Sequence, residues 1–488
     1  MERTSKMVEN KSFFDKLTPD KIAIAILIIS AFLFSILVFF GKGVYGGADN
    51  AAHFKYARYA FDNPRFFFNY WAKPGYTSMI APVAQMGFDA VRVFNVILGI
   101  IAAFFTYLIG KRLNYKNAFL LPLLVIFAPG FATSMMSTNT ETAFIFITVL
   151  SFYFIVKENY KAGIIILSFA FLFRPEAVFF MGVVGLIILF KKKFKLIPWF
   201  FTGAIVFFVI ASWFYGGMEW LKDFFPYGSP DEYGGGTGDF LHYARKSKLI
   251  FGIPHALLLA LGVVVVLAGL FWNKIRENQH IIFNKYLLIL FSLVGFYLIQ
   301  SIAIWKGLGT SYGPFRHMVP VIPFSALIAL DGYNILYRYI GKYRYIGITL
   351  TLVLAYLLIR TPFHIADIPT QLKPDQEAVY KATKWLKTSK YYDNKIYFYN
   401  SFFTAFDDDL DPYNPARATF SWGIKDTKKV PEGSIIMWDP HFAPGRGDPL
   451  EEFKDNPNFK LLKIIRPEYK FEKNGYPYGI YIFIKQQG

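Results

Sequence analysis

The chain has 488 residues, of which 54% are hydrophobic, 20% aromatic and only 18% charged. A soluble protein of this length would carry more charge and fewer long apolar runs, so the composition indicates a membrane protein. The 52 Lys and Arg residues outnumber the 34 Asp and Glu residues, but they recur as short clusters between apolar runs, which argues against nucleic-acid binding. The absence of cysteine excludes disulfides, thiolate metal sites and cysteine nucleophiles.

The apolar runs predict a polytopic α-helical membrane protein, because a helix needs about 20 apolar residues to cross the hydrocarbon. The first 20 residues are polar, and the run at 21–40 has no small-residue cleavage site behind it. It is therefore interpreted as a retained first span rather than a signal peptide. About 11 spans are predicted, at residues 21–40, 90–110, 118–134, 139–156, 162–174, 177–190, 196–215, 249–272, 285–305, 317–337 and 345–360.

The basic clusters orient these spans. With a cytoplasmic N-terminus, every cluster falls on the cytoplasmic side, as the positive-inside rule requires, provided that residues 74–87 do not cross. That segment begins with a proline and is too short for a span, so an interfacial helix is expected there. We therefore predict a multi-pass protein of the plasma (inner) membrane. The clusters lie at 111–116, 157–161, 191–195, 274–285 and 338–344.

This topology divides the chain into a cytoplasmic segment (1–20), a transmembrane domain (21–360) and a soluble extracytoplasmic domain (361–488). The transmembrane domain has external loops at 41–89, expected to hold juxtamembrane helices, and at 216–248. The last domain has a helical pattern followed by strand-like runs that Pro and Gly separate, which predicts a small α/β or α+β fold. The helical pattern covers 375–386, and the strand-like runs cover 395–399, 434–438 and 479–484.

The first external loop holds a candidate general base. Asp49 follows two glycines just after the first span, and His53 comes one helical turn later, so the two would share a face of a helix. A carboxylate here could deprotonate an incoming hydroxyl. The alternative is that Asp49 caps the helix and His53 is merely interfacial. Arg58 and Lys73 lie further along the same loop.

Other charged residues lie on the same predicted face of the membrane. Glu141 opens the fourth span, Arg174 and Glu176 lie between the fifth and sixth spans, and Arg316 and His317 precede the tenth. Ionisable groups near membrane depth are costly and therefore raise a functional question. Snorkelling or pairing at helix ends would explain each residue singly, but not why they gather on one side. Cationic groups there would suit a lipid phosphate.

Together these motifs resemble the GT-C superfamily of membrane glycosyltransferases, which includes the protein O-mannosyltransferases and the aminoarabinose transferases that modify lipid A. Members carry an acidic motif directly after the first span, followed by Arg-Tyr-Ala and Lys-Pro elements. The matching stretches are Asp49, Arg58-Tyr59-Ala60, Lys73-Pro74-Gly75, Val91-Arg92-Val93-Phe94-Asn95, Arg174-Pro175-Glu176 and Arg316-His317 with Pro320.

The resemblance implies transfer of a sugar, hexosyl or pentosyl, from a polyprenyl-phosphate donor to a lipid, glycan or protein acceptor on the outer face of the membrane. Asp49 would be the general base, while Arg174, Arg316 or Lys73 would stabilise the departing phosphate. His53, Arg58, Glu141, Glu176 and His317 would complete the substrate- and phosphate-binding set.

The sequence departs from the family at Asn50, where many members have a second acidic residue. A single carboxylate argues against a metal held by two acidic residues, so no obligatory cofactor is expected. Glu141 or Glu176 could still supply oxygen ligands to a divalent cation.

Two other functions stay open at this stage. A flippase or transporter for a lipid-linked sugar would need charges near the midplane of several spans, and most spans lack them. An envelope-polysaccharide polymerase would use a lipid-diphosphate donor. The acidic run at 407–411 lacks the spacing of a calcium loop and is interpreted as a solvated turn.

Overall fold

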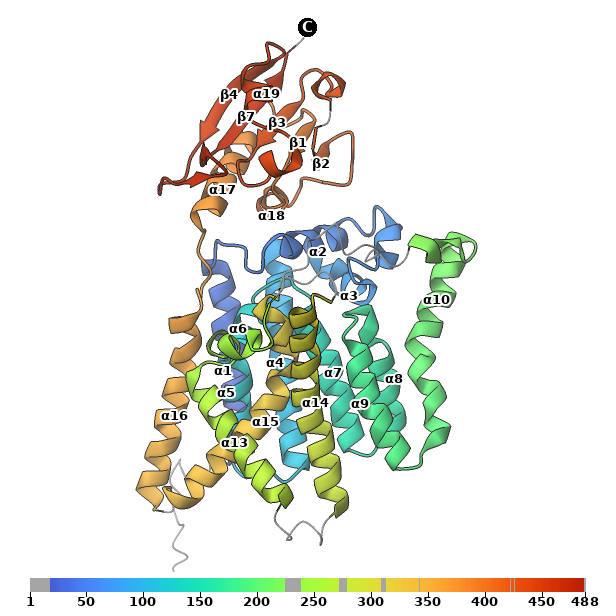
Figure 1. Cartoon of the computed structure of the whole chain (residues 1–488), viewed down its shortest axis with the longest axis vertical. Helices are drawn as coiled ribbons and strands as arrows, with labels where there is room; N and C mark the ends of the chain where they lie inside the picture. The colour runs from blue at the N-terminus through green and yellow to red at the C-terminus, as the bar shows by residue number, and fades with distance from the viewer. Residues whose placement is uncertain are drawn as a thin grey trace, which may run out of the picture.

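The computed structural model of the chain describes residues 18–223, 238–271, 279–308, 313–341, 343–421, 423–424 and 426–486. Figure 1 shows two parts, a bundle of long helices and above it a smaller domain of strands and helices formed by the C-terminal residues. Some predictions fall outside the described residues: most of the N-terminal segment, the middle of the loop 216–248, and the basic residues Lys274, Arg276 and Lys342.

Among the described residues, six helices are long and apolar enough to cross a membrane. A bent pair, Ala118–Ile126 (η3 and α5) with α6 (Pro129–Met135), makes a possible seventh crossing segment with an angle of 68°. The bend falls at Ala128, which is extended because the following proline disfavours a helical conformation there. The six helices are α1 (Pro19–Phe40), α4 (Phe88–Arg112), η5 with α10 (Phe194–Tyr215), Leu288–Lys306 of α14 (Gln279–Lys306), η9 with α15 (Phe315–Tyr339) and α16 (Arg344–Ile365).

Four shorter apolar helices complete the bundle: α7 (Glu141–Val156), α8 with η4 (Tyr160–Leu172), α9 (Ala177–Phe190) and α13 (Ile253–Phe271). All these segments coincide in sequence with the predicted spans, so the prediction of a mostly helical, multi-pass membrane protein is confirmed. The count of 11 crossings stays a prediction, because the shorter helices fall below the roughly 20 residues that a span needs.

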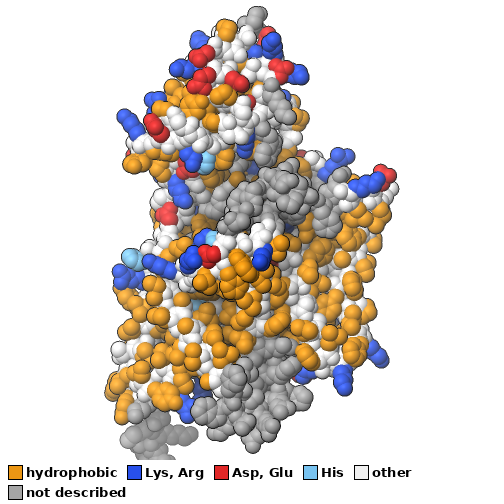
Figure 2. Space-filling model, viewed as in Figure 1, with side chains coloured by type: hydrophobic (Ala, Val, Ile, Leu, Met, Phe, Trp, Pro, Cys, Tyr) orange, Lys and Arg blue, Asp and Glu red, His pale blue; other side chains and the backbone are white. Residues whose placement is uncertain are grey.

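The outer surface of the bundle suits a lipid environment. Figure 2 shows hydrophobic side chains covering the sides of the bundle, while charged side chains gather near its two ends and on the C-terminal domain. Phe32, Val209 and Leu352 are among the large apolar residues exposed on its helices. The loops that follow α9 and α15, which contain predicted basic clusters, lie at the end of the bundle opposite the C-terminal domain (Figure 1). This arrangement is the one that the charge-derived topology requires.

The first external loop forms short helices between the bundle and the C-terminal domain (Figure 1). They are α2 (Ala48–Arg58), η2 (Pro64–Phe68) and α3 (Pro74–Ala84). The expected interfacial helix corresponds to α3, which begins with proline at its first turn and has 11 residues, too few to cross a membrane. Further short elements of the bundle region are η6 (Glu219–Asp223), α11 (His242–Arg245) and α12 (Ser247–Ile250).

The C-terminal domain contains a five-stranded mixed sheet in the order β2-β1-β3-β7-β4. Strand β1 is parallel to β2 and β3, while β7 is antiparallel to β3 and β4. Its central strand β3 is buried along its whole length, as expected for a strand covered on both faces. The bounds are α17 (Pro374–Lys387), β1 (Ile396–Phe398), α18 (Phe402–Phe406), β2 (Ala418–Phe420), η10 (Thr427–Lys429), β3 (Ile435–Trp438), η11 (Pro444–Arg446), α19 (Glu451–Lys454), β4 (Phe459–Ile465), β5 (Glu472–Lys473), β6 (Tyr476–Pro477) and β7 (Ile480–Lys485).

The acidic turn at 407–411 fastens this domain to α2. The buried ammonium of Lys55 donates hydrogen bonds to the backbone carbonyls of Asp407, Asp408 and Leu410 at 2.7, 2.8 and 2.9 Å. The Asp408 carboxylate accepts a hydrogen bond from the Phe88 amide at 3.2 Å. The interpretation as a solvated turn is therefore wrong, because its carbonyls serve an inter-domain contact.

Candidate active site

Five charged side chains form a continuous series of ion pairs at the end of the bundle that faces the C-terminal domain. The Arg316 guanidinium donates to the Asp49 carboxylate, and its Nε lies 3.7 Å from Glu141 Oε1. The same Glu141 oxygen accepts a hydrogen bond from Arg174 Nη1 at 2.7 Å. Arg174 Nη2 in turn donates to Glu176 Oε1 at 2.8 Å. We call these five residues the ion-pair network.

The network joins segments that are far apart in the sequence. Asp49 lies in the first turn of α2, and Glu141 is the first residue of α7. Arg174 and Glu176 occupy the short connection between η4 and α9, and Arg316 belongs to η9. Each residue therefore stands at or near a helix end, where backbone amides or carbonyls are left for side chains to meet. The ion pairs show that the fold brings these ends together.

The exposure of the side chains is highest at Asp49, at one end of the network, and lowest at Glu141, in its middle. Asp49 is 43% exposed, Arg316 17%, Glu176 16%, Arg174 11% and Glu141 only 2%. Buried charges are tolerated only when they are paired, and Glu141 lies between two guanidinium groups. Asp49 is thus the carboxylate of the network with the best access to an incoming molecule.

Asp49 is not the residue that caps α2. The N-cap is Gly47, which has a φ of 79° that favours glycine, and Asp49 comes two residues later. Its carboxylate therefore sits close to the positive end of the helix dipole. Burial raises the pKa of Asp49, but nearby cationic groups, above all the Arg316 guanidinium, lower it more, so its pKa lies below the usual value. The group is ionised at neutral pH, as a proton acceptor must be.

His53 lies one turn after Asp49, as predicted, and belongs to an aromatic cluster. Its ring stacks on Trp71 with centroids 5.3 Å apart and meets Tyr76 edge-on at 5.9 Å. Its Nδ1 lies 3.2 Å from the carbonyl oxygen of Ala72. Burial lowers the pKa of His53 to about 4, so the ring is neutral at physiological pH. His53 therefore packs as a neutral ring against Trp71 and Tyr76, one helical turn from Asp49.

Lys73 supplies a third cation beside the network. It has a φ of 67°, and its ammonium donates to the Tyr70 carbonyl at 3.2 Å and lies 4.8 Å from the Tyr70 ring centre. Burial, together with the nearby Arg174, lowers the pKa of Lys73 to about 8, so the side chain is still mostly charged at pH 7. His317 follows Arg316 in η9.

Arg58 is the one predicted site residue that the structure does not bring to the network. It ends α2, and its guanidinium donates to the Ala84 carbonyl at 3.3 Å and to the Gln85 carbonyl. It also lies 4.0 Å from Asp409 of the C-terminal domain. Its position thus connects α2, α3 and the C-terminal domain.

Asn50 is almost completely buried and contacts residues outside the network. Its side-chain oxygen accepts a hydrogen bond from the Thr138 amide at 2.7 Å, and its amide group donates to the Tyr45 carbonyl. The Thr138 hydroxyl donates to the Asn50 carbonyl at 2.6 Å. Asn50 therefore links the start of α2 to the segment before α7. Within the described part of the chain, no three His, Asp or Glu residues gather as a metal site would require.

Two further residues support the site, and only the first of them carries a signal in the sequence. Asn95, a polar residue inside an apolar span, donates to the Tyr76 hydroxyl at 2.8 Å and to the Ser137 carbonyl at 2.6 Å. Lys55 has no local feature that distinguishes it from an exposed helix residue. Its acceptors lie more than 350 residues later in the chain, so sequence reasoning missed it.

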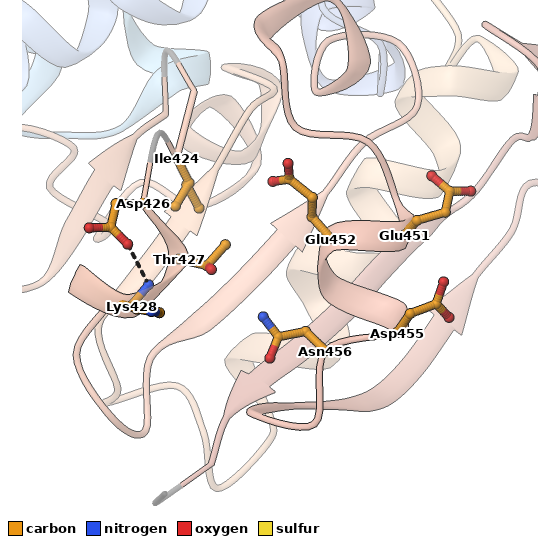
Figure 3. A pocket seen from close by; sticks show the side chains of 8 residues that line it. All are labelled: Ile424, Asp426, Thr427, Lys428, Glu451, Glu452, Asp455 and Asn456. Carbon is orange, nitrogen blue, oxygen red and sulfur yellow. Dashed lines mark hydrogen bonds between the residues drawn. The ribbon is translucent and has the colours of Figure 1, made fainter.

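A hollow of about 410 Å³ on the C-terminal domain lies apart from the network (Figure 3). Its lining comes from the segment around η10 and from α19, and most of its charged groups are carboxylates. No residue of the ion-pair network contributes to it. The lining residues are Ile424, Asp426, Thr427, Lys428, Glu451, Glu452, Asp455 and Asn456.

The molecule thus belongs to the class of polytopic membrane proteins with an ionic site at one end of the bundle, beneath a soluble domain. No protein-family model and no curated protein sequence matches the chain. The structure is similar to ArnT from Cupriavidus metallidurans in the apo state, with a TM-score of 0.58 and 10% identity over 96% of this chain and 98% of that one. The same protein bound to undecaprenyl phosphate matches with a TM-score of 0.56 and 10% identity over 94% and 97%.

A further similar structure is arabinofuranosyltransferase AftD from Mycobacteria, with a TM-score of 0.52 and 10% identity over 95% of this chain and 40% of that one. At this level of identity the likeness concerns the fold. The chain shares its fold with ArnT and AftD, which agrees with the fold that the resemblance in its sequence motifs implies.

Proposed function

We propose that the protein transfers a sugar from a polyprenyl-phosphate donor to an acceptor hydroxyl at the membrane surface. The observation that carries this proposal is the ion-pair network, which presents an accessible carboxylate, Asp49, beside two guanidinium groups within a GT-C fold. The undecaprenyl phosphate bound to ArnT supports a lipid phosphate as the ligand of such a fold.

The reaction is a single displacement at the anomeric carbon. A bond forms from the acceptor oxygen to that carbon while the bond from the carbon to the phosphate oxygen breaks, and the acceptor proton passes to Asp49. Arg316, Arg174 and Lys73 offset the charge that develops on the departing phosphate. Because phosphate leaves as an anion, no general acid is required.

The location of the charges favours an enzyme over a transporter. The network lies at helix ends on one face of the bundle rather than along a path through the membrane. A flippase would need polar groups near the midplane of several spans. A polysaccharide polymerase would differ from the proposed enzyme in its donor, a lipid diphosphate, and the assay described next separates the two.

The test uses the full-length protein in liposomes with a panel of undecaprenyl-phosphate sugars and undecaprenyl-diphosphate sugars. We expect release of undecaprenyl phosphate from a monophosphate donor in the presence of an acceptor extract. Asp49→Asn should reduce this rate by about 10²- to 10⁴-fold, the usual contribution of a general base. The matched control is Asp62→Asn, an exposed carboxylate of the same loop, which should keep full activity.

Retained transfer by Asp49→Asn would overturn the assignment of the base. Turnover of the diphosphate donors alone would overturn the proposed transferase in favour of a polymerase. The yield and thermal midpoint of both variants in detergent show whether they fold, and we expect neither to change much because the Asp49 side chain is 43% exposed.

A further inference from the structure

The cationic side chains of the site already form ion pairs or hydrogen bonds with other groups of the protein. Arg316 contacts Asp49 and Glu141, and Arg174 contacts Glu141 and Glu176. The Lys73 ammonium is held by Tyr70. A phosphate that enters the site therefore has to share or take over a cation that a protein group now contacts.

The pair between Asp49 and Arg316 is the easiest to exchange. Of the three carboxylates in the network, Asp49 is the most exposed, whereas Glu141 is buried between the two guanidinium groups. Asp49 also keeps a favourable position without Arg316, because it lies in the first turn of α2 near the positive end of the helix dipole.

Arg316 would keep its orientation after losing Asp49. Its Nη1 donates to the Gly46 carbonyl at 3.0 Å, and its Nε lies 3.7 Å from Glu141. Nη2 now binds Asp49. With the other two contacts in place, Nη2 would still point toward the most exposed part of the network. Guanidinium groups bind phosphate and carboxylate with the same hydrogen-bond geometry, so a phosphate oxygen can replace the carboxylate oxygen.

We propose that the donor phosphate displaces Asp49 from Arg316, so that Asp49 becomes a competent base only when the donor is bound. This inference rests on the proposed function and adds to it an order of events, with the donor binding before the acceptor is deprotonated. The exchange puts one anion in place of another on Arg316. It leaves Asp49 without its cation and next to a new negative charge, both of which increase its affinity for a proton.

The exchange predicts that removing the charge of Asp49 strengthens donor binding while it abolishes transfer. Asp49→Asn frees Arg316 from its competitor, so undecaprenyl phosphate should bind about tenfold more tightly than to the unaltered protein, which corresponds to the strength of one charged hydrogen bond. Binding is measured by titrating undecaprenyl phosphate into the detergent-solubilised full-length protein and following the complex by native mass spectrometry.

Two further variants complete the experiment. Asp62→Asn should bind undecaprenyl phosphate as the unaltered protein does, and Arg316→Lys, which keeps a charge but loses the planar donor group, should bind it more weakly. Equal or weaker binding by Asp49→Asn overturns the exchange and leaves the proposed function standing. Failure of the unaltered protein to bind undecaprenyl phosphate overturns the proposed function itself, and the exchange with it.

Discussion

Asn50 shows how a single residue can depart from a family motif for a structural reason. Many members of the superfamily that the sequence resembles have an acidic residue at this position, yet here the side chain acts as both an acceptor and a donor. Its oxygen binds the Thr138 amide and its NH₂ group binds the Tyr45 carbonyl, and the residue is buried. A carboxylate could satisfy the first contact, but it would oppose the carbonyl oxygen in the second.

Asn50→Asp should therefore destabilise the protein without adding a metal-binding carboxylate. We expect a loss of about 1–3 kcal/mol in unfolding free energy, because a buried charged oxygen would face another oxygen. The measurement is the thermal midpoint in detergent, together with transfer activity in the presence and absence of EDTA. Asn63→Asp, at an exposed position of the same loop, is the control. New stimulation by a divalent cation in Asn50→Asp would contradict this account.

The residues of the ion-pair network could be predicted as a group, but their pairings could not. Helix-end positions and the alternation of crossings place Asp49, Glu141, Arg174, Glu176 and Arg316 on one face of the bundle. Which guanidinium meets which carboxylate depends on the helices that are neighbours in space, and α7 and η9 are neighbours although more than 150 residues separate them. Hydropathy and charge carry no information about that adjacency.

At the scale of elements, α2 connects the site to the C-terminal domain. One end of this helix carries Asp49, and the other carries Lys55 and Arg58, which contact the acidic turn at 407–411 and its neighbours. Burial lowers the pKa of Lys55 to about 8, so the ammonium is still mostly protonated at neutral pH. The helix α2 therefore connects the C-terminal domain directly to the segment that carries Asp49.

Lys55→Met should loosen this contact. The substitution leaves the carbonyls of residues 407, 408 and 410 without their buried donor, which costs roughly 1–3 kcal/mol for an unsatisfied buried group. We expect faster hydrogen exchange in peptides that cover 402–420 and in the Phe88 amide, which is hydrogen-bonded to Asp408.

The control for this experiment is Lys381→Met. Its ammonium pairs with Glu377 and Glu468 at the surface of the C-terminal domain, so its loss should leave exchange at residues 402–420 unchanged. Equal exchange in the two variants would mean that the contact through Lys55 does not hold the domain on α2. A parallel fall in transfer activity for Lys55→Met alone would connect this contact to Asp49.

At the scale of the whole molecule, composition and hydropathy were sufficient to predict the membrane bundle and the existence of a separate C-terminal domain. The three strand-like runs correspond to β1, β3 and β7, but the short strand β2 and its parallel pairing with β1 could not be foreseen. Its three residues carry too little alternation to distinguish a strand from a loop. The docking of the domain could not be predicted either, because Lys55 binds backbone carbonyls that no side-chain pattern marks in the sequence.

The last prediction concerns the sidedness of the molecule in the cell. The basic loops after α9 and α15 lie opposite the C-terminal domain, so the positive-inside rule predicts that this domain and the ion-pair network are outside the cytoplasm. Because the chain contains no cysteine, single cysteines can report this directly. Lys454→Cys, on the exposed side of α19, should react with a membrane-impermeant thiol reagent on intact cells, and Lys195→Cys, exposed at the start of η5, should react only after lysis. The reverse pattern would place the network on the cytoplasmic face, where a donor presented at the outer leaflet could not reach Asp49.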